Sequence, residues 1–161
     1  MRYRAGILGM AAVALAASTI AVAGGAQART PWCSTSQLRL DVTSGEELAS
    51  NLRTALITLR NESSETCATQ GYPGVDMSAS SGGVQHIPRN GAVGKPIQLA
   101  PHQSATATLT YMFGATDWIV DEIIVTPPDN TVSLRAVWDW RRLGAVTFAQ
   151  PGAVEISPLR S

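Results

Sequence analysis

The two histidines, His86 and His102, are the side chains of this chain best suited to move a proton near neutral pH. Either one could act as a general base if folding brought a serine or an aspartate beside it. His86 lies in a candidate strand and His102 in the turn Pro101-His102-Gln103, so the sequence does not connect them. No Gly-x-Ser-x-Gly, His-Glu-x-x-His, Ser-x-x-Lys or phosphate-binding glycine motif accompanies them. We therefore expect two partly exposed histidines, in a loop or a strand, without a catalytic role.

A group of carboxylates at Asp117, Asp121 and Glu122 could bind calcium or act as a catalytic pair. Calcium needs six or more oxygen ligands from a shaped loop, and glycosidase chemistry needs a controlled separation between two carboxyl groups. Neither requirement can be read from this spacing, so we expect a solvated acidic loop. The sequence predicts no cofactor and no metal.

Two tryptophans near the C-terminus, Trp138 and Trp140, are the strongest indication of a binding surface. On a strand they would point the same way, together with Leu134 and Ala136. Paired tryptophans on an exposed face can stack on sugar rings or anchor a protein partner. Four apolar residues in register are more typical of a face that packs in the core. Of the two tryptophans, Trp140 lies nearer the strand end and is expected to be the more exposed.

Tyr72, in Tyr72-Pro73-Gly74, is a third candidate recognition residue, because sandwich proteins commonly bind through loops at their ends. The Pro-Gly step also favours a type II turn in which Gly74 takes a positive φ. That turn explains the motif without a binding role, and we prefer it.

Residues 1–28 have the pattern of a signal peptide. Arg2 and Arg4 precede an apolar stretch from Ala5 to Ala23, and Ala26-Gln27-Ala28 supplies small residues for cleavage. The stretch is long enough that an uncleaved membrane anchor is the alternative. We expect export and cleavage after Ala28, which gives a signal peptide over 1–28 and one domain over 29–161.

The mature chain would have 133 residues (161 − 28), enough for one domain with a hydrophobic core. Loss of Arg2 and Arg4 would leave 10 basic and 12 acidic side chains, a net charge of −2. This near-neutral balance gives no general attraction to nucleic acid or to anionic lipid, and we expect neither as a partner.

The only two cysteines, Cys33 and Cys67, would remain in the mature chain. In an oxidising compartment such a pair usually forms an intramolecular disulfide. Two free thiols or a metal site are the alternatives. A zinc site would need about four ligands, and no clustered Cys/His set completes one.

Short stretches with period-two alternation, separated by Gly, Pro, Asn and Ser, dominate the rest of the chain. Helical signals are limited to single turns at 44–48 and 116–120. This pattern predicts an all-β fold, a two-sheet antiparallel β-sandwich of about seven to nine short strands. The candidate strands are 38–42, 52–60, 72–77, 84–87, 105–111, 123–126, 132–140, 146–148 and 154–156.

Two segments, Leu59-Arg60-Asn61 and Cys67-Ala68-Thr69-Gln70-Gly71-Tyr72-Pro73-Gly74-Val75, resemble a secreted actinobacterial family known as domain of unknown function 4232. Val125-Thr126-Pro127-Pro128 is similar to a later motif of that family. The resemblance extends from Cys33 to Leu159. It implies an immunoglobulin-type sandwich exported to the cell envelope, and it implies no catalytic residue.

We therefore expect an exported, non-enzymatic binding or interaction module, secreted or held in the cell envelope. Its ligand is unknown. The candidate partners are a cell-wall glycan and an envelope protein. One alternative is a secreted hydrolase that uses His86 or His102. Another is a secreted protein inhibitor of a hydrolase, which would present a rigid loop at 78–83 or 88–94.

Overall fold

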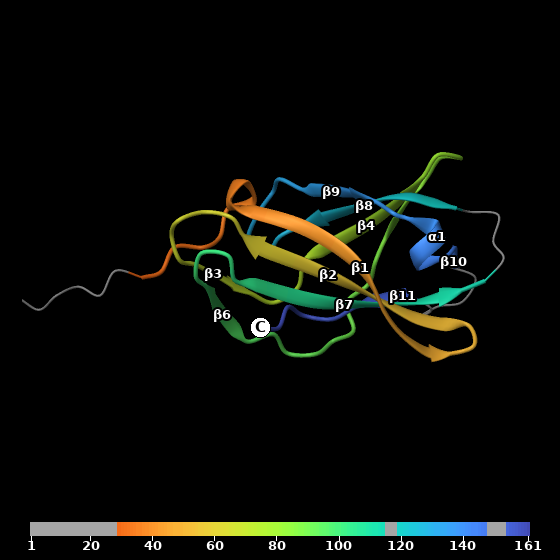
Figure 1. The fold of residues 1–161 in the computed structure, drawn as a ribbon, viewed down its shortest axis with the longest axis horizontal. Helices are drawn as coiled ribbons and strands as arrows, with labels where there is room; N and C mark the ends of the chain where they lie inside the picture. Colours follow the sequence, from red (N-terminus) through yellow and green to blue (C-terminus); the bar gives the residue numbers. More distant parts are fainter. Residues whose placement is uncertain (1–28, 115–118, 148–153) are drawn as a thin grey trace, which may run out of the picture.

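The computed structural model describes residues 29–114, 119–147 and 154–161. These residues form two antiparallel β-sheets packed face to face, with a separate two-stranded pair beside them (Figure 1). Within these residues, two short helices accompany the strands, the 3-10 helix η1 (Thr35–Gln37) before the first strand and the α-helix α1 (Trp140–Leu143) after the ninth. The predicted signal peptide, together with Asp117 and Trp118, lies outside the described residues. Among the described residues, no helix is both long enough and apolar enough to cross a membrane.

The first sheet is built around the long central strand β7. The strand β2 pairs with one side of β7, and β1 pairs with β2 to form the edge. The short strands β10 and β11 pair in turn with the other side of β7. Their bounds are β1 Leu38–Ala49, β2 Leu52–Asn61, β7 Ser104–Phe113, β10 Val146–Thr147 and β11 Val154–Ile156.

The second sheet has the order β5-β4-β8-β9, and a separate pair joins β3 to β6. The orders β1-β2-β7 and β5-β4-β8-β9 correspond to the A-B-E and C′-C-F-G sheets of an immunoglobulin fold. The predicted sandwich is confirmed, but it has eleven strands in the described residues, because the sequence pattern missed the short β3–β6 pair. The bounds are β3 Cys67–Gln70, β4 Gly74–Ala79, β5 Val84–His86, β6 Pro96–Leu99, β8 Val120–Thr126 and β9 Leu134–Val137.

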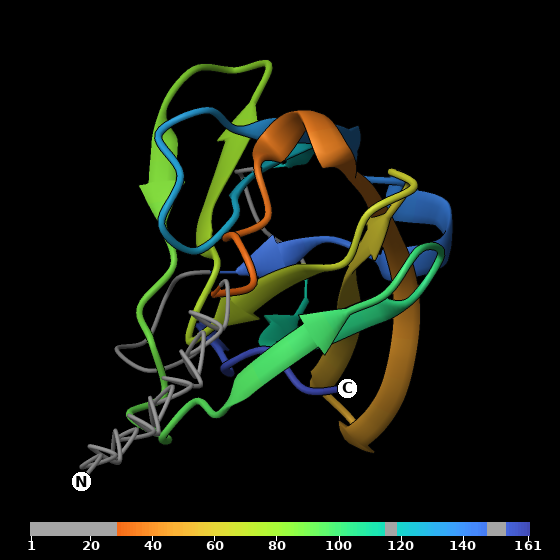
Figure 2. The same ribbon diagram turned by 90° about the vertical axis from the view of Figure 1, so that its left-hand side faces the viewer.

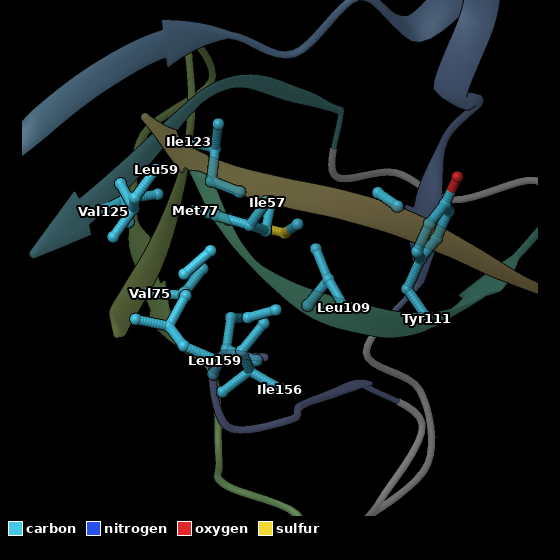
Figure 3. Packing of buried hydrophobic residues seen from close by; sticks show 14 of the residues in the cluster. Ile57, Leu59, Val75, Met77, Leu109, Tyr111, Ile123, Val125, Ile156 and Leu159 are labelled. Carbon is cyan, nitrogen blue, oxygen red and sulfur yellow. The ribbon is translucent and has the colours of Figure 1, made fainter. Parts of the chain in front are cut away.

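The core lies between the two sheets and follows the period-two pattern of their strands. Alternate residues of β2 and β7 point inward from one sheet, and alternate residues of β4 and β8 point inward from the other (Figure 3). Each fully buried aliphatic side chain contributes about 1.5–3 kcal/mol to the free energy of unfolding. The inward residues include Ala55, Ile57, Leu59, Ala107, Leu109, Tyr111, Val75, Met77, Ile123 and Val125.

The predicted helical turn at 44–48 is wrong, because this segment continues β1 through a bulge. The Thr54 Oγ1 atom accepts a hydrogen bond from Glu46 N at 2.7 Å and donates one to Glu46 O. A Cβ atom on Gly45 would lie 2.3 Å from the same oxygen. Glycine at position 45 therefore allows the two strands to approach closely, and the hairpin extends beyond the sandwich (Figure 1).

The predicted strand at 132–140 ends at Val137, and the helix α1 (Trp140–Leu143) follows. Asp139 caps the helix, since its side chain accepts a hydrogen bond from Arg141 N at 3.1 Å. Gly144 ends it with a φ of 82°.

The positive φ predicted for Gly74, in the turn Tyr72-Pro73-Gly74, is wrong. The glycine with a positive φ in this segment is Gly71, at 88°.

The disulfide between Cys33 and Cys67 is present, with the two Cα atoms 4.8 Å apart. Both cysteines are buried, so neither the free-thiol nor the metal-site alternative holds. The backbone N–H of Ala68 donates to Pro31 O, and the backbone N–H of Cys33 donates to Ala68 O. These two hydrogen bonds join the segment around Cys33 to β3. The disulfide thus fixes the start of the domain against β3, and closing this loop removes about 3–4 kcal/mol of chain entropy from the unfolded state. Figure 2 views the sandwich from this end.

The β2–β3 connection is organised by Asn61, whose side chain is fully buried. Its Nδ2 atom donates to Glu65 O at 2.7 Å and to Leu99 O at 2.9 Å. Its Oδ1 atom accepts hydrogen bonds from the backbone and the hydroxyl of Ser63. The side chain therefore has all its hydrogen bonds, and its nitrogen is not open to the glycosylation that Asn61-Glu62-Ser63 would otherwise permit.

One end of the core is closed by Tyr111. Its ring is 1% exposed, and its hydroxyl donates to Leu143 O at 2.5 Å, so it holds the last turn of α1. Figure 3 shows Tyr111 at the end of the buried residues, with its hydroxyl directed away from them. Burial raises the pKa of Tyr111 above its ordinary value of 10, and the nearby charge of Arg53 lowers it in part.

Substituting Asn61→Ala should lower the free energy of unfolding by about 2–4 kcal/mol, because it leaves buried carbonyl groups without a donor. Asn51→Ala is the matched control, since Asn51 is exposed and contributes only its backbone oxygen, to Phe113 N. Chemical denaturation of both variants measures the difference. Equal stabilities would show that the Asn61 hydrogen bonds do not hold this connection.

The stability of the protein should fall as the pH rises above about 10. The unfolded tyrosine loses its proton near that pH, while Tyr111 in the folded state keeps it to a higher pH, so deprotonation favours unfolding. In Tyr111→Phe, this part of the pH dependence should be absent. Thermal unfolding of both proteins between pH 8 and about pH 11 tests this, and identical slopes would contradict it.

Candidate binding site

The two tryptophans of the predicted binding surface are in different environments. Trp138 is 2% exposed, and its indole Nε1 donates to Gly144 O at 2.9 Å. Its ring meets Tyr111 edge-on, with 5.3 Å between centroids. Trp140 begins α1 and is 59% exposed. Trp138 is therefore a core residue, the environment that the apolar alternation favours, and not part of a binding surface, whereas Trp140 is exposed and available to a ligand.

The exposed ring of Trp140 forms part of a pocket of about 430 Å³, which we call the aromatic–arginine pocket. The pocket lies where the end of β7 meets α1, at the end of the sandwich opposite the disulfide (Figure 1). It has two aromatic side chains, two arginines and three small residues. Its walls are Arg53, Phe113, Gly114, Trp140, Arg141, Gly144 and Ala145.

Arg53 reaches this pocket from the inner face of β2. It lies in the same inward series as Ala55 and Ile57, and its direct partner across the sheet is Tyr111. The guanidinium carbon of Arg53 is 3.9 Å from the centre of the Phe113 ring, a cation–π contact worth about 0.5–2 kcal/mol. A charged side chain thus occupies the first inward position of β2, at the end of the core that opens to solvent.

The hydrogen bonds of Arg53 are incomplete. Its Nη2 atom is 3.3 Å from Glu47 Oε2, and the Glu47 side chain is 56% exposed. Its Nε atom is buried without a hydrogen-bond partner among the described residues. A guanidinium carries five N–H donors, so the described residues use only a small part of the donor capacity of Arg53.

The shape of the pocket depends on Gly144. A Cβ atom at this position would lie 2.3 Å from Phe113 Cε2 and 3.4 Å from Arg53 Nη1. The φ of 82° at Gly144 is also one that glycine adopts most easily. Glycine is therefore required here for both conformation and space, and its small size brings Phe113 and Arg53 to the pocket wall.

The charge of the pocket wall is positive. Arg53 and Arg141 both line it, and no acidic residue lies among its described walls. The guanidinium of Arg141 is 5.8 Å from the centre of the Trp140 ring. The whole chain has a formal net charge of zero, so this concentration of positive charge is local. Such a site can stack a planar or cyclic group on an aromatic ring beside positive charge.

Tyr72 serves mainly to hold a loop. Its hydroxyl lies 2.8 Å from Asn90 Oδ1 and 2.6 Å from Ala92 O, which fixes the segment after β5. Its ring packs against the core and lies 5.3 Å from the guanidinium of Arg89. Tyr72 also lines a separate pocket of about 350 Å³ at the other end of the sandwich. The structure does not bring Tyr72 together with Trp140.

The two histidines lie on the surface in separate places. His86 Nδ1 is 2.6 Å from Asp76 Oδ1, and these two residues face each other across β4 and β5. The His86 side chain is 73% exposed. His102 Nδ1 is 3.8 Å from Glu62 Oε2 and is also largely exposed. Neither histidine lines the pockets described here.

The two described members of the predicted acidic group, Asp121 and Glu122, make separate contacts. The Asp121 carboxylate accepts a hydrogen bond from Ser80 N, and Glu122 pairs with Arg135. Asp117 lies outside the described residues. Within 29–114, 119–147 and 154–161, no three His, Cys, Asp or Glu side chains gather as a metal site would require.

The sequence reasoning did not identify Arg53 or Phe113. Both residues continue the predicted inward-facing series of their strands. Arg53 precedes Ala55 by two residues, and Phe113 follows Tyr111 by two. A charged residue at an inward position is the signal that could have been followed. The pairing of Arg53 with Tyr111 depends on the register of β2 against β7, which the sequence does not specify.

Comparison with known proteins identifies the family of this chain. A family model described as a domain of unknown function (DUF4232) matches residues 33–159. Comparisons with curated proteins and with solved structures find no significant match. The matched region begins at the disulfide residue Cys33 and ends at the core residue Leu159, so it includes the whole sandwich. The chain therefore belongs to the DUF4232 family of domains of unknown function.

Proposed function

We propose that this protein is an exported, non-enzymatic binding module of the cell envelope, and that it binds cell-wall glycan through the aromatic–arginine pocket. The observation that carries this proposal is the exposed Trp140 ring on a pocket wall that also contains Phe113. A tryptophan that is 59% exposed leaves a large apolar surface in water. A sugar ring that covers this surface would remove it from water, which favours binding.

The surroundings of the ionisable side chains support binding rather than catalysis. The closest candidate for a catalytic pair, His86 with Asp76, lies on the surface at the β5 edge of the four-stranded sheet. A general base works best in a cleft that positions the substrate and excludes water. Neither His86 nor His102, the proposed bases of a hydrolase, lines one of the pockets described above.

Export is supported by the signal-peptide pattern of residues 1–28 and by the buried disulfide. Disulfides persist in oxidising compartments, where this one would hold the start of the domain against β3. An envelope location would place the pocket beside the polysaccharides that we propose as its ligand.

The inhibitor hypothesis remains an untested alternative. The β4–β5 hairpin contains the predicted loop 78–83 and extends beyond the sandwich (Figure 1). The second predicted loop, 88–94, is held by the hydroxyl of Tyr72. Neither loop has an aromatic ring with the exposure of Trp140, so glycan binding is the function that the geometry supports best.

Trp140→Ala should weaken binding to purified actinobacterial cell-wall polysaccharide by about tenfold or more in a co-sedimentation assay, because it removes the stacking surface. Trp32→Ala is the matched control, since Trp32 is 51% exposed and lies at the opposite end of the sandwich. Both variants remove an exposed indole, so only the position differs.

The control variant should bind as the wild type does, and circular dichroism should show that both variants remain folded. An equal loss in both variants would assign the binding to nonspecific adsorption. If the wild-type protein does not sediment with the polysaccharide, glycan binding is wrong.

A further inference from the structure

We propose that the aromatic–arginine pocket selects a negatively charged glycan, and that Arg53 binds the charged group. This inference rests on the proposed glycan-binding function and goes further, because it names the chemical class of the ligand. The carboxylate of an acidic sugar and the phosphate of a phosphodiester-linked polymer share the chemistry that Arg53 would recognise.

The first support is the position of Arg53 on the strand. An inward-facing position at the end of a core normally holds an apolar residue, and Ala55, Ile57 and Leu59 follow this pattern on the same face. Placing a guanidinium there costs desolvation energy, which a negative partner would offset. Within the described part of the chain, the ion pair of Arg53 is with Glu47, which approaches one nitrogen at 3.3 Å and is itself mostly exposed.

The second support is the unused donors of Arg53. The hydrogen bond to Glu47 uses Nη2, and the cation–π contact with Phe113 uses no N–H group. The Nη1 atom lies beside Gly144, on the pocket wall. A guanidinium held by these two contacts, with donors at a pocket that no described residue uses, is well suited to a planar carboxylate or to a phosphate.

The third support is the balance of charge around the pocket. Arg141 is a second arginine on the wall and lies beside the Trp140 ring. With no acidic residue among the described wall residues, the pocket would favour an anion over a neutral ligand and disfavour a cation. A sugar ring on Trp140 and an anionic substituent on Arg53 would use both features of the pocket at once.

The experiment compares three forms of the same actinobacterial cell-wall polysaccharide: untreated, with carboxyl groups reduced to alcohols, and with phosphodiesters cleaved by hydrofluoric acid. The complete chain is expressed, and binding of the exported protein to each form is measured by co-sedimentation. We expect one treatment to weaken binding about 10- to 100-fold, the range for a lost hydrogen bond to a charged group. The treatment that does so identifies the anion as carboxylate or phosphate.

Arg53→Gln tests the assignment to this residue through selectivity, which a purely structural defect would not change. The variant should bind the untreated and the neutralised polysaccharide equally. Arg53→Lys should keep part of the preference, because it retains the charge without the fork of donors. Arg60→Gln is the matched control at the far end of β2, where Arg60 pairs with the exposed Glu62, and it should keep the full preference.

The outcomes separate this inference from the proposed function. If wild-type protein binds all three forms equally and Trp140→Ala still weakens binding, glycan binding stands and the preference for an anion is wrong. If Arg53→Gln keeps the wild-type preference, Arg53 is not the group that binds the anion. If the wild-type protein binds none of the forms, the proposed function itself fails.

Discussion

The contact between Tyr111 and Trp138 is the interaction on which the functional end of this molecule depends. The two rings meet edge-on inside the sandwich, and each has one polar atom that needs a partner. Those partners are successive backbone carbonyls, Leu143 O for the Tyr111 hydroxyl and Gly144 O for the Trp138 indole. Two buried side chains, one from β7 and one from the segment just after β9, therefore hold the end of α1 and close the core there.

The aromatic–arginine pocket follows from this constraint. Once the end of α1 is held, Gly144 lies against Phe113 with no room for a side chain, and Trp140 at the start of the helix is left facing solvent. Arg53, opposite Tyr111 in the sheet, then reaches the pocket across the face of Phe113. The same packing that completes the core thus places an exposed indole and a guanidinium on one wall, and the described residues leave most of the donors of that guanidinium unused.

The alternation of apolar and polar residues along the strands made most of the fold predictable. The aromatic–arginine pocket depends on contacts between strands and α1, which this alternation does not describe. Regular stretches such as Ala105 to Tyr111 specify both a strand and its buried face, and the two cysteines had only each other as partners. The residues around Trp138 also alternate, but Asp139 caps a helix there and ends the pattern after Val137. As a result, two tryptophans two positions apart have opposite environments. Arg53 was missed because its role depends on strand register, which sets it opposite Tyr111.

The central claim is that a ligand contacts Trp140 while Trp138 remains a core residue. Fluorine NMR of protein labelled with 5-fluorotryptophan tests this directly, because single Trp→Phe variants assign the signal of each ring. During a titration with soluble fragments of cell-wall polysaccharide, the signal of Trp140 should shift progressively, and those of Trp138 and Trp32 should stay in place. A shift confined to Trp32, or no shift at saturating fragment concentration, would contradict the assignment of the binding site.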